Sequence, residues 1–194
     1  HSEVLRSGGS FYVHSVLWVS TVLPPSGPVS GGTRLAVIGS GFREAATMRC
    51  RMEESSGTAV ARVVSDGQLE CTAPAASGEG VRVVEVSMNG QQYSSSGVEY
   101  TYRSAVVISS VWPLAGASEG GTPVTLTGRG FSSAAEAAGQ MWCRFNATVS
   151  RAAYVSEAEA VCNTTQSAAG LVSVEASTNG RDFSSGGVQF EFVT

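Results

Sequence analysis

An internal repeat constrains the fold of this chain more than any other feature of its sequence. A segment with a Pro-turn, a Gly-Gly-Thr and a Gly-x-Gly-Phe occurs at residues 22–42 and again at 111–131, an offset of 89. An Asn-Gly pair and an aromatic-rich ending occur at residues 89–102 and again at 179–192, an offset of 90. The 194 residues therefore hold two copies of one unit of about 90 residues, the size of a small domain.

Each copy has the pattern of β-strands separated by turns. Short β-branched runs such as 35–38 and 124–127 lie between Gly- and Ser-rich segments, and residues 81–88 alternate apolar with polar positions, Val81 and Val83 among the apolar ones. This pattern predicts a small all-β sandwich in each copy.

Two local features add detail to this β pattern. The Asn-Gly pairs at 89–90 and 179–180 predict type I′ hairpin turns, in which both central residues have positive φ. An Ala-rich insertion at 133–140 in the second copy predicts about one turn of helix.

The charge of the chain excludes several classes of function. Twelve basic residues, all Arg, against sixteen acidic ones give a net charge of −4, so nucleic acid is not an expected partner. Apolar runs such as 16–19 are far too short to insert into a membrane. The two His precede the first copy, only Asp66 and Asp182 are Asp, and Glu53-Glu54 and Glu157-x-Glu159 are interpreted as solvated charges, so we expect no catalytic residues, metal site or cofactor.

The first residues resemble the end of a copy. Ser7-Gly8-Gly9 and the aromatic residues up to His14 are similar to residues 185–192, which predicts that residues 1–14 are the tail of a preceding repeat. An unrelated N-terminal arm is the alternative. The expected domains are then 15–103 and 104–194, joined without a flexible linker.

Together these motifs resemble a known family. The succession of Pro-x-x-Gly, Gly-Gly-Thr, Gly-x-Gly-Phe, a Cys-Arg pair, a second Cys, Asn-Gly and a closing Phe/Tyr-x-Phe/Tyr is similar to the IPT/TIG domain, an immunoglobulin-like β-sandwich. The resemblance covers nearly the whole chain, twice, and implies an all-β fold of two tandem sandwiches. It also implies that Gly31-Gly32-Thr33 forms the turn into the second strand and that Gly39 and Gly41 bend the backbone beside Phe42.

Four cysteines allow three pairings. Because one pair occupies matching places in each copy, we expect the intradomain disulfides Cys50–Cys71 and Cys143–Cys162. Buried free thiols are the alternative, and a zinc site is disfavoured because no Cys-x-x-Cys occurs.

Two glycosylation acceptor sequences lie in the second copy, at Asn146-Ala147-Thr148 and Asn163-Thr164-Thr165. If Cys143 and Cys162 face the core, strand alternation turns both Asn side chains outward. N-linked glycan and paired cysteines favour an extracellular or cell-surface location.

The tryptophans are candidates for partner contact. Trp142 precedes Cys143 and should point outward, which makes it the best candidate for a contact residue, although packing under a loop or glycan is favoured over that role. Trp18 is expected near the entrance to the first domain, against a preceding repeat. The IPT/TIG family includes extracellular stalks and adhesion ectodomains of plexin-like and fibrocystin-like proteins, Rel-type DNA-binding factors and accessory modules of starch-acting enzymes, so fold alone does not choose a function.

The sequence therefore predicts a non-catalytic extracellular structural or adhesion module, a stiff spacer that contacts protein partners or neighbouring repeats. The composition, with Arg in place of Lys throughout, is associated with GC-rich genomes and points to an algal cell-surface or ciliary-appendage glycoprotein. An accessory or carbohydrate-binding domain of a secreted carbohydrate-active protein is the alternative.

Overall fold

The structure is a computed structural model that describes residues 17–53 and 57–194 of the chain. The expected tail of a preceding repeat at residues 1–14 lies outside the described residues, as does Glu54.

Each copy of the repeat folds into strands in the same order. The first copy contains β1 (Trp18–Leu23), β2 (Ser26–Pro28), β3 (Arg34–Ser40), β4 (Arg49–Met52), β5 (Thr58–Val60), β6 (Arg62–Ser65), β7 (Gln68–Thr72), β8 (Gly80–Ser87) and β9 (Val98–Arg103). The second contains β10 (Val107–Trp112), β11 (Ala115–Ala117), β12 (Pro123–Arg129), α1 (Ser133–Ala137), β13 (Trp142–Phe145), β14 (Thr148–Ser156), β15 (Glu159–Asn163), β16 (Gly170–Ser177) and β17 (Gln189–Val193). The chain is thus all-β apart from α1, and each copy is a sandwich of immunoglobulin type.

The two layers of each sandwich are joined at one corner. In the first domain the layers are β1-β3-β7-β6 and β2-β9-β8-β4-β5, with Ala61 buried between β5 and β6. In the second domain β14 runs through this corner without a break, so its first half pairs with β13 and its second half with β15. Ala152 is buried at the crossing, where the backbone changes from one layer to the other.

Each sandwich has its own hydrophobic core. The first is built around Phe42, Tyr100 and Tyr102, and the second around Phe131, Phe145, Phe190 and Phe192. The paired aromatic residues of the last strands pack edge to face, Tyr100 on Tyr102 with ring centroids 5.0 Å apart and Phe190 on Phe192 at 5.1 Å. Because the cores are separate, each domain has the means to fold as a unit.

The glycine-rich turns have the roles expected of them. Gly31 and Gly32 have φ values of 72° and 90° and lead into β3, and Gly41 has a φ of 81° beside buried Phe42. Gly39 is required for another reason: a Cβ there would overlap the carbonyl oxygen of Trp18, which lies close because the β1–β3 register shifts between Val19 and Thr21.

Two local expectations are wrong. The Asn-Gly pairs do not form type I′ hairpin turns, since Asn146 is the one non-glycine among the described residues with a positive φ. Asn89 and Asn179 instead cap their loops with their side chains, which satisfies backbone N–H groups without a left-handed Asn.

The other correction concerns the register of β8. Val84 and Val86 face the core, whereas Val81 is half exposed, so the inward positions are one residue away from those the alternation suggested. The predicted helical insertion is present as α1, with Ser132 as its N-cap.

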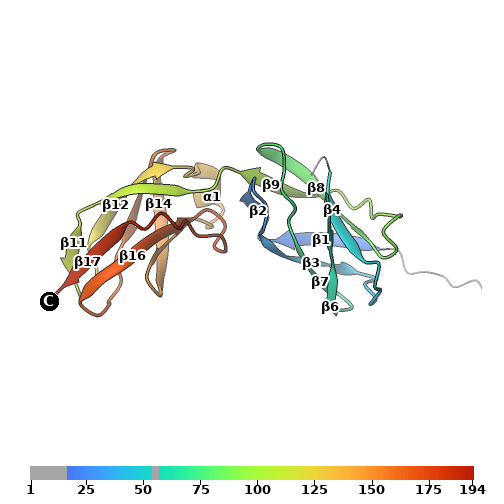
Figure 1. The fold of residues 1–194 in the computed structure, drawn as a ribbon, viewed down its shortest axis with the longest axis horizontal. Helices are drawn as coiled ribbons and strands as arrows, with labels where there is room; N and C mark the ends of the chain where they lie inside the picture. The colour runs from blue at the N-terminus through green and yellow to red at the C-terminus, as the bar shows by residue number, and fades with distance from the viewer. Residues whose placement is uncertain (1–16, 54–56) are drawn as a thin grey trace, which may run out of the picture.

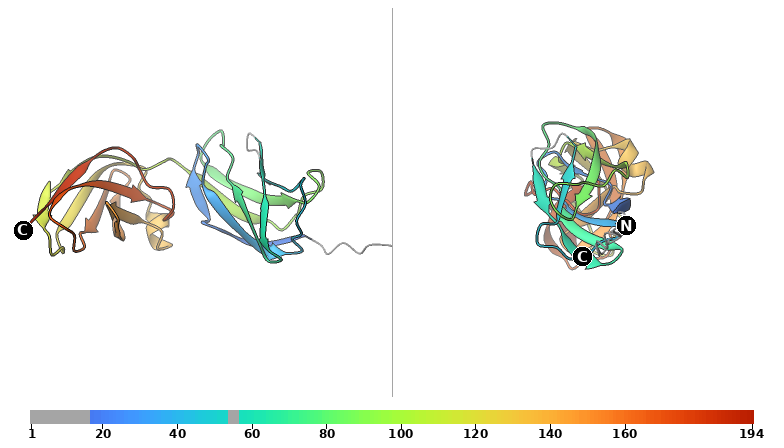
Figure 2. Two further views of the ribbon diagram at one scale, coloured as in Figure 1. Left: turned by 60° about the horizontal axis from the view of Figure 1, so that its bottom comes forward. Right: turned by 90° about the vertical axis from the view of Figure 1, so that its right-hand side faces the viewer.

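The two sandwiches lie end to end along the long axis of the molecule, as Figure 1 and the left view of Figure 2 show. β9 of the first domain and β10 of the second are separated by residues 104–106 alone, of which Val106 is buried. The junction between the domains is therefore short.

Candidate functional site

The most elaborate polar cluster outside the two cores lies at the junction of the domains. We call residues 177–182 of the second domain, between β16 and β17, the docking loop. Inside it, Asn179 Oδ1 accepts hydrogen bonds from the backbone N–H groups of Arg181 and Asp182 and from the Ser177 hydroxyl. These bonds hold the loop in a fixed shape that presents the Asn179 amide to the first domain.

The docking loop binds the first domain through two side chains. Asn179 Nδ2 donates to the carbonyl oxygen of Ser26 at 2.9 Å, and the Thr33 hydroxyl donates to Asp182 Oδ2 at 2.7 Å. Asn179 Nδ2 also donates to Asp182 Oδ2 at 2.6 Å, which ties the two contacts together. Asn179 is 8% exposed and Thr33 is fully buried, so these bonds are largely shielded from water.

The surface that receives the loop is formed by Ser26–Pro28 and Thr33, which we call the receiving end of the first domain. Gly27 allows the side chains of Tyr100 and Thr33 to lie against the backbone of β2, because a Cβ at this position would overlap both the Tyr100 hydroxyl and Thr33 Oγ1. Burial raises the pKa of Tyr100 above its ordinary value, and it raises the pKa of Tyr102 to about 12. Both phenols are therefore neutral at physiological pH.

The connecting segment is held by two further side chains. Glu79, just before β8, accepts hydrogen bonds from the hydroxyl of Ser104 and from its backbone N–H, the latter at 2.7 Å. These bonds lower the pKa of Glu79. Across the junction, Arg103 Nη1 donates to Ser132 Oγ at 3.1 Å, and this same oxygen caps α1.

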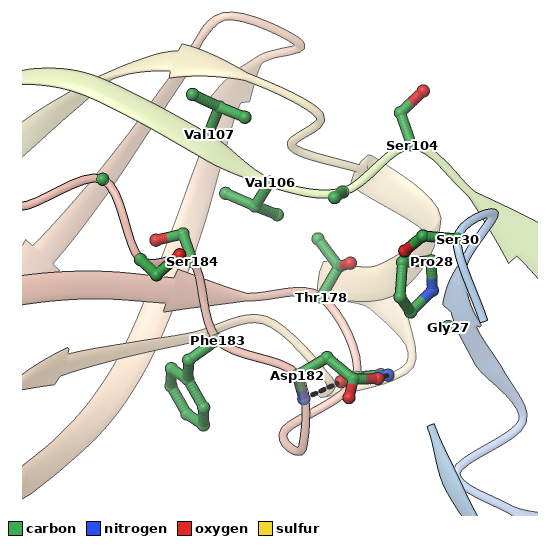
Figure 3. A pocket seen from close by; sticks show the side chains of 14 residues that line it. Gly27, Pro28, Ser30, Ser104, Val106, Val107, Thr178, Asp182, Phe183 and Ser184 are labelled. Atoms are coloured by element: carbon green, nitrogen blue, oxygen red, sulfur yellow. Dashed lines mark hydrogen bonds between the residues drawn. The ribbon is translucent and has the colours of Figure 1, made fainter. Parts of the chain in front are cut away.

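Two open clefts flank the junction. One, of about 380 Å³, lies between the receiving end and the loop; Pro28 and Ser30 of the first domain and Val106, Asp182 and Ser184 of the second are among the residues that line it (Figure 3). The other, of about 430 Å³, lies beside Glu79, Arg103 and α1. Ser104 lines both clefts, so the connecting segment lies between them, and the docking loop borders the first cleft alone.

The first domain carries the same loop at its opposite end. We call residues 87–92 the free loop. Its Asn89 Oδ1 accepts from the backbone N–H groups of Gln91 and Gln92 at 2.9 Å and from the Ser87 hydroxyl at 3.1 Å, the pattern of the docking loop. Unlike Asn179, Asn89 is exposed.

Both expected disulfides are present. Cys50 on β4 is bonded to Cys71 on β7, and Cys143 on β13 to Cys162 on β15, with Cα atoms 6.6 and 6.2 Å apart. Each bond joins the two layers of one sandwich, and all four residues belong to the cores. The alternatives of free thiols and a zinc site do not apply to this structure.

Asn146 and Asn163, the two glycosylation candidates, are exposed in the structure. Asn146 lies in the turn between β13 and β14 with a φ of 55°, and Asn163 is the last residue of β15. The hydroxyl of Thr148, the third residue of the first acceptor sequence, donates to the carbonyl oxygen of Phe145. Both Asn side chains thus meet the steric requirement for modification, and their occupancy stays a prediction.

The tryptophans differ in how much of their surface is free. Trp142 is half-buried: the Arg151 guanidinium lies 3.7 Å from the centre of its ring, and Gly180 of the docking loop lies close to its indole nitrogen. It therefore packs beneath a side chain and a loop. Trp18 is 53% exposed at the start of β1, and Trp112 is 75% exposed at the end of β10.

Sequence reasoning missed the junction residues. The Asn-Gly pair was interpreted as a turn alone, although a signal was present: Asp182 stands where the first copy has Gln92. Thr33 gave no separate signal, because the same Gly-Gly-Thr occurs in both copies, and Ser26 takes part through its backbone carbonyl, which any residue carries.

Within residues 17–53 and 57–194, no group of three or more His, Cys, Asp or Glu side chains is arranged to hold a metal ion. Within the same ranges, no helix has the length and apolar character needed to cross a membrane.

Comparison with known proteins agrees with the fold. Fibrocystin-L of Homo sapiens is 33% identical over 121 residues, which are 59% of this chain and 3% of that protein. Two structures of the plexin A4 extracellular region cover the whole chain at 20% identity, with TM-scores of 0.51 and 0.55, and the chain covers 20% and 17% of them. The chain thus spans a small part of the length of each of these proteins. The IPT/TIG domain family matches residues 17–102 and 106–192, and the chain belongs to this family as two tandem copies.

Proposed function

We propose that the chain is a non-catalytic extracellular spacer, in which two disulfide-bonded sandwiches are held at a fixed angle and offer surfaces to protein partners or neighbouring repeats. The observation that carries this proposal is the buried bridge at the junction, where Asn179 binds the Ser26 carbonyl and Asp182 accepts from Thr33. A freely hinged pair would not bury these polar groups.

Three observations support an extracellular location. Each domain has a disulfide between its layers, and such bonds persist in oxidising compartments. Asn146 and Asn163 are exposed and available for N-linked glycan. Two structures that match over the full chain are of the plexin A4 extracellular region. All basic residues are Arg, a composition associated with GC-rich genomes such as those of green algae. We therefore extend the proposal to a protein of the cell surface or ciliary appendages of an alga.

The carbohydrate-binding alternative has weaker support. A sugar-binding face needs aromatic rings side by side, and the exposed Trp18 and Trp112 belong to different domains. Trp142, the third candidate, has its ring covered by Arg151.

The location is tested by expressing residues 1–194 behind a signal peptide in eukaryotic cells. We expect secreted protein with no free thiol and with glycan on Asn146 or Asn163, detected as a mass loss on enzymatic deglycosylation. Asn146→Gln and Asn163→Gln assign the sites. Retention with four free thiols and no glycan would contradict an extracellular role.

The spacer role is tested by small-angle X-ray scattering of the same chain. A rigid pair gives one elongated particle whose scattering fits the end-to-end arrangement of Figure 1. As a reference for a flexible pair, a Gly-Ser insertion between Arg103 and Ser104 should broaden the distance distribution. If the native chain scatters like the insertion variant, it is not a stiff spacer.

A further inference from the structure

The free loop of the first domain has the shape of a docking element with nothing docked on it. Ser94 fixes its far end as Ser184 fixes that of the docking loop: Ser94 Oγ accepts from Val86 N–H at 3.0 Å, and Ser184 Oγ accepts from Ala176 N–H at 3.1 Å. The loop therefore holds its conformation without a second domain. The exposed Asn89 amide donates one N–H to Gln92 Oε1 at 3.4 Å, as Asn179 does to Asp182, and has a second N–H for a partner.

The second domain, for its part, has an uncovered receiving end. Ala115, Gly116 and Thr122 occupy the places of Ser26, Gly27 and Thr33, and β11 pairs in parallel with β17 as β2 does with β9. Ser26, Gly27 and Thr33 are buried, whereas Ala115, Gly116 and Thr122 are all partly exposed. Leu114, in the place of half-buried Pro25, is 67% exposed.

The two domains of this chain meet in one head-to-tail interface, and each domain leaves the other half of such an interface unoccupied. We propose that the free loop of the first domain and the receiving end of the second are docking surfaces for further IPT/TIG domains. This inference rests on the proposed spacer function and names its partners. Each partner is a covalently linked neighbouring domain, because two hydrogen bonds bury too little to hold separate molecules without the high effective concentration of a tether.

The chemistry at the two free ends is complementary. Asn89 Nδ2 supplies the donor that the Ala115 carbonyl would accept, as Asn179 does for Ser26. Gln92 replaces Asp182. Its amide oxygen would accept from the Thr122 hydroxyl of a neighbouring domain, as the carboxylate accepts from Thr33. A neutral amide also costs less to bury than a carboxylate.

The length of chain between domains also matches. Ser15-Val16-Leu17-Trp18 aligns with Ser104-Ala105-Val106-Val107, the segment that joins β9 to β10. A domain fused at Ser15 directly after Val193 would therefore begin at the same distance from its neighbour as the second domain does from the first. Repetition of such a contact is heterologous and does not close, which gives an extended array.

The test is a three-domain chain made of residues 1–193 followed directly by residues 15–103. Peptides covering residues 115–122 occur once in it, so hydrogen exchange there reports on the new junction alone. We expect their exchange to slow about tenfold relative to the 1–194 chain, the effect of one to two shielded hydrogen bonds.

Asn89→Asp in the added domain is the decisive variant, because it keeps the oxygen that shapes the loop and replaces the donor with a second acceptor. It should return exchange at residues 115–122 to the rate of the 1–194 chain. Gln91→Ala in the same loop is the matched control, since Arg181 at the equivalent place is exposed, and it should leave the protection intact. A third disulfide and a second copy of the first domain's unfolding transition would show that the added domain is folded.

Unchanged exchange at residues 115–122 with a folded added domain would overturn the inference, as would protection that survives Asn89→Asp. The existing junction serves as an internal reference. If peptides covering residues 177–182 of the docking loop, which also occur once, stay protected while 115–122 do not, the spacer function of the pair stands and only the extension to further domains fails. Loss of protection at both places would reject the spacer function itself.

Discussion

The docking loop and the free loop share a Ser-x-Asn-Gly sequence and the same pattern of internal hydrogen bonds, yet Asn179 is buried and Asn89 is exposed. Asn179 Oδ1 and Asn89 Oδ1 each accept from two backbone N–H groups within their loops. The difference lies outside the loop: only Asn179 has a neighbouring domain, and its Nδ2 reaches Ser26. The loop is therefore shaped by its own residues and docks with little further ordering.

A second difference separates the receiving ends. The last strand of the first domain carries Tyr100 and Tyr102 where the second carries Phe190 and Phe192. Tyr102 donates to the carbonyl oxygen of Pro74 at 2.6 Å, and the Tyr100 hydroxyl lies beside Gly27 under the junction. The occupied end thus has polar groups within its core that the free end lacks.

The largest effect expected is the loss of a disulfide. Replacing Cys50 and Cys71 by Ala should lower the free energy of unfolding of the first domain by about 3 kcal/mol, and Cys143 and Cys162 by Ala should do the same to the second. Because the cores are separate, calorimetry should show one transition shifted and the other unchanged. If either variant shifts both transitions equally, the domains do not unfold independently.

The next effect distinguishes the two receiving ends. Gly27→Ala places a Cβ against the Tyr100 hydroxyl and Thr33, and we expect it to cost about 2 kcal/mol of overpacking in the first domain. At Gly116 the three atoms nearest to such a Cβ all belong to half-buried Thr122, and the second domain has Phe190 where the first has Tyr100, so Gly116→Ala should cost less than Gly27→Ala. Thermal denaturation measures both, and equal losses would show that the Tyr100 hydroxyl adds no constraint at Gly27.

A smaller effect compares the two loops directly. Asn179→Asp keeps the oxygen that shapes the loop but replaces the N–H donor to Ser26 and Asp182 with an acceptor oxygen. It should therefore weaken docking by about 1–2 kcal/mol, measured as faster hydrogen exchange at residues 26–33. Asn89→Asp in the 1–194 chain should change stability by less than about 0.5 kcal/mol, because its amide meets solvent. An equal response of both variants would mean that the Asn179 contact is not used.

The smallest effect appears only in alkaline solution. The folded-state pKa of Tyr102 is raised to about 12 and that of Tyr100 is also raised, both above the unfolded value near 10. Above pH 10 the unfolded chain releases phenolic protons that the folded chain retains, so the stability of the first domain is complete below pH 10 and falls as the pH rises towards 12. Denaturant titrations at pH 8 and pH 11 should show this loss, and Tyr102→Phe should reduce it. An equal fall in Tyr102→Phe would show that other groups cause it.

The sequence predicts the domains, the strands and the disulfides because these depend on patterns that occur twice. Cys50 and Cys143 align in the repeat, and so do their partners, so intradomain pairing is the most economical choice, and the structure has it. The helix at α1 is predicted because Ala-rich residues interrupt an otherwise β pattern. The IPT/TIG resemblance supplies the arrangement of the strands.

The junction escapes such reasoning because it depends on contacts between residues far apart in sequence. Asn179 and Ser26 are 153 positions apart, and Asn179 lies in the same Ser-x-Asn-Gly pattern as Asn89. The repeat even hides the site, since the shared pattern suggests the same surroundings for both loops. Only the three-dimensional structure shows that one loop has a neighbour and the other does not.

The central claim is that the docking loop fixes the angle between the domains, and residual dipolar couplings of the 1–194 chain test it most directly. If the claim holds, amides of both domains fit one alignment tensor with the relative orientation of Figure 1, and Asn179→Asp, but not Arg181→Ala, separates them into two. Two different tensors in the native chain would show that the domains reorient independently and would contradict the account.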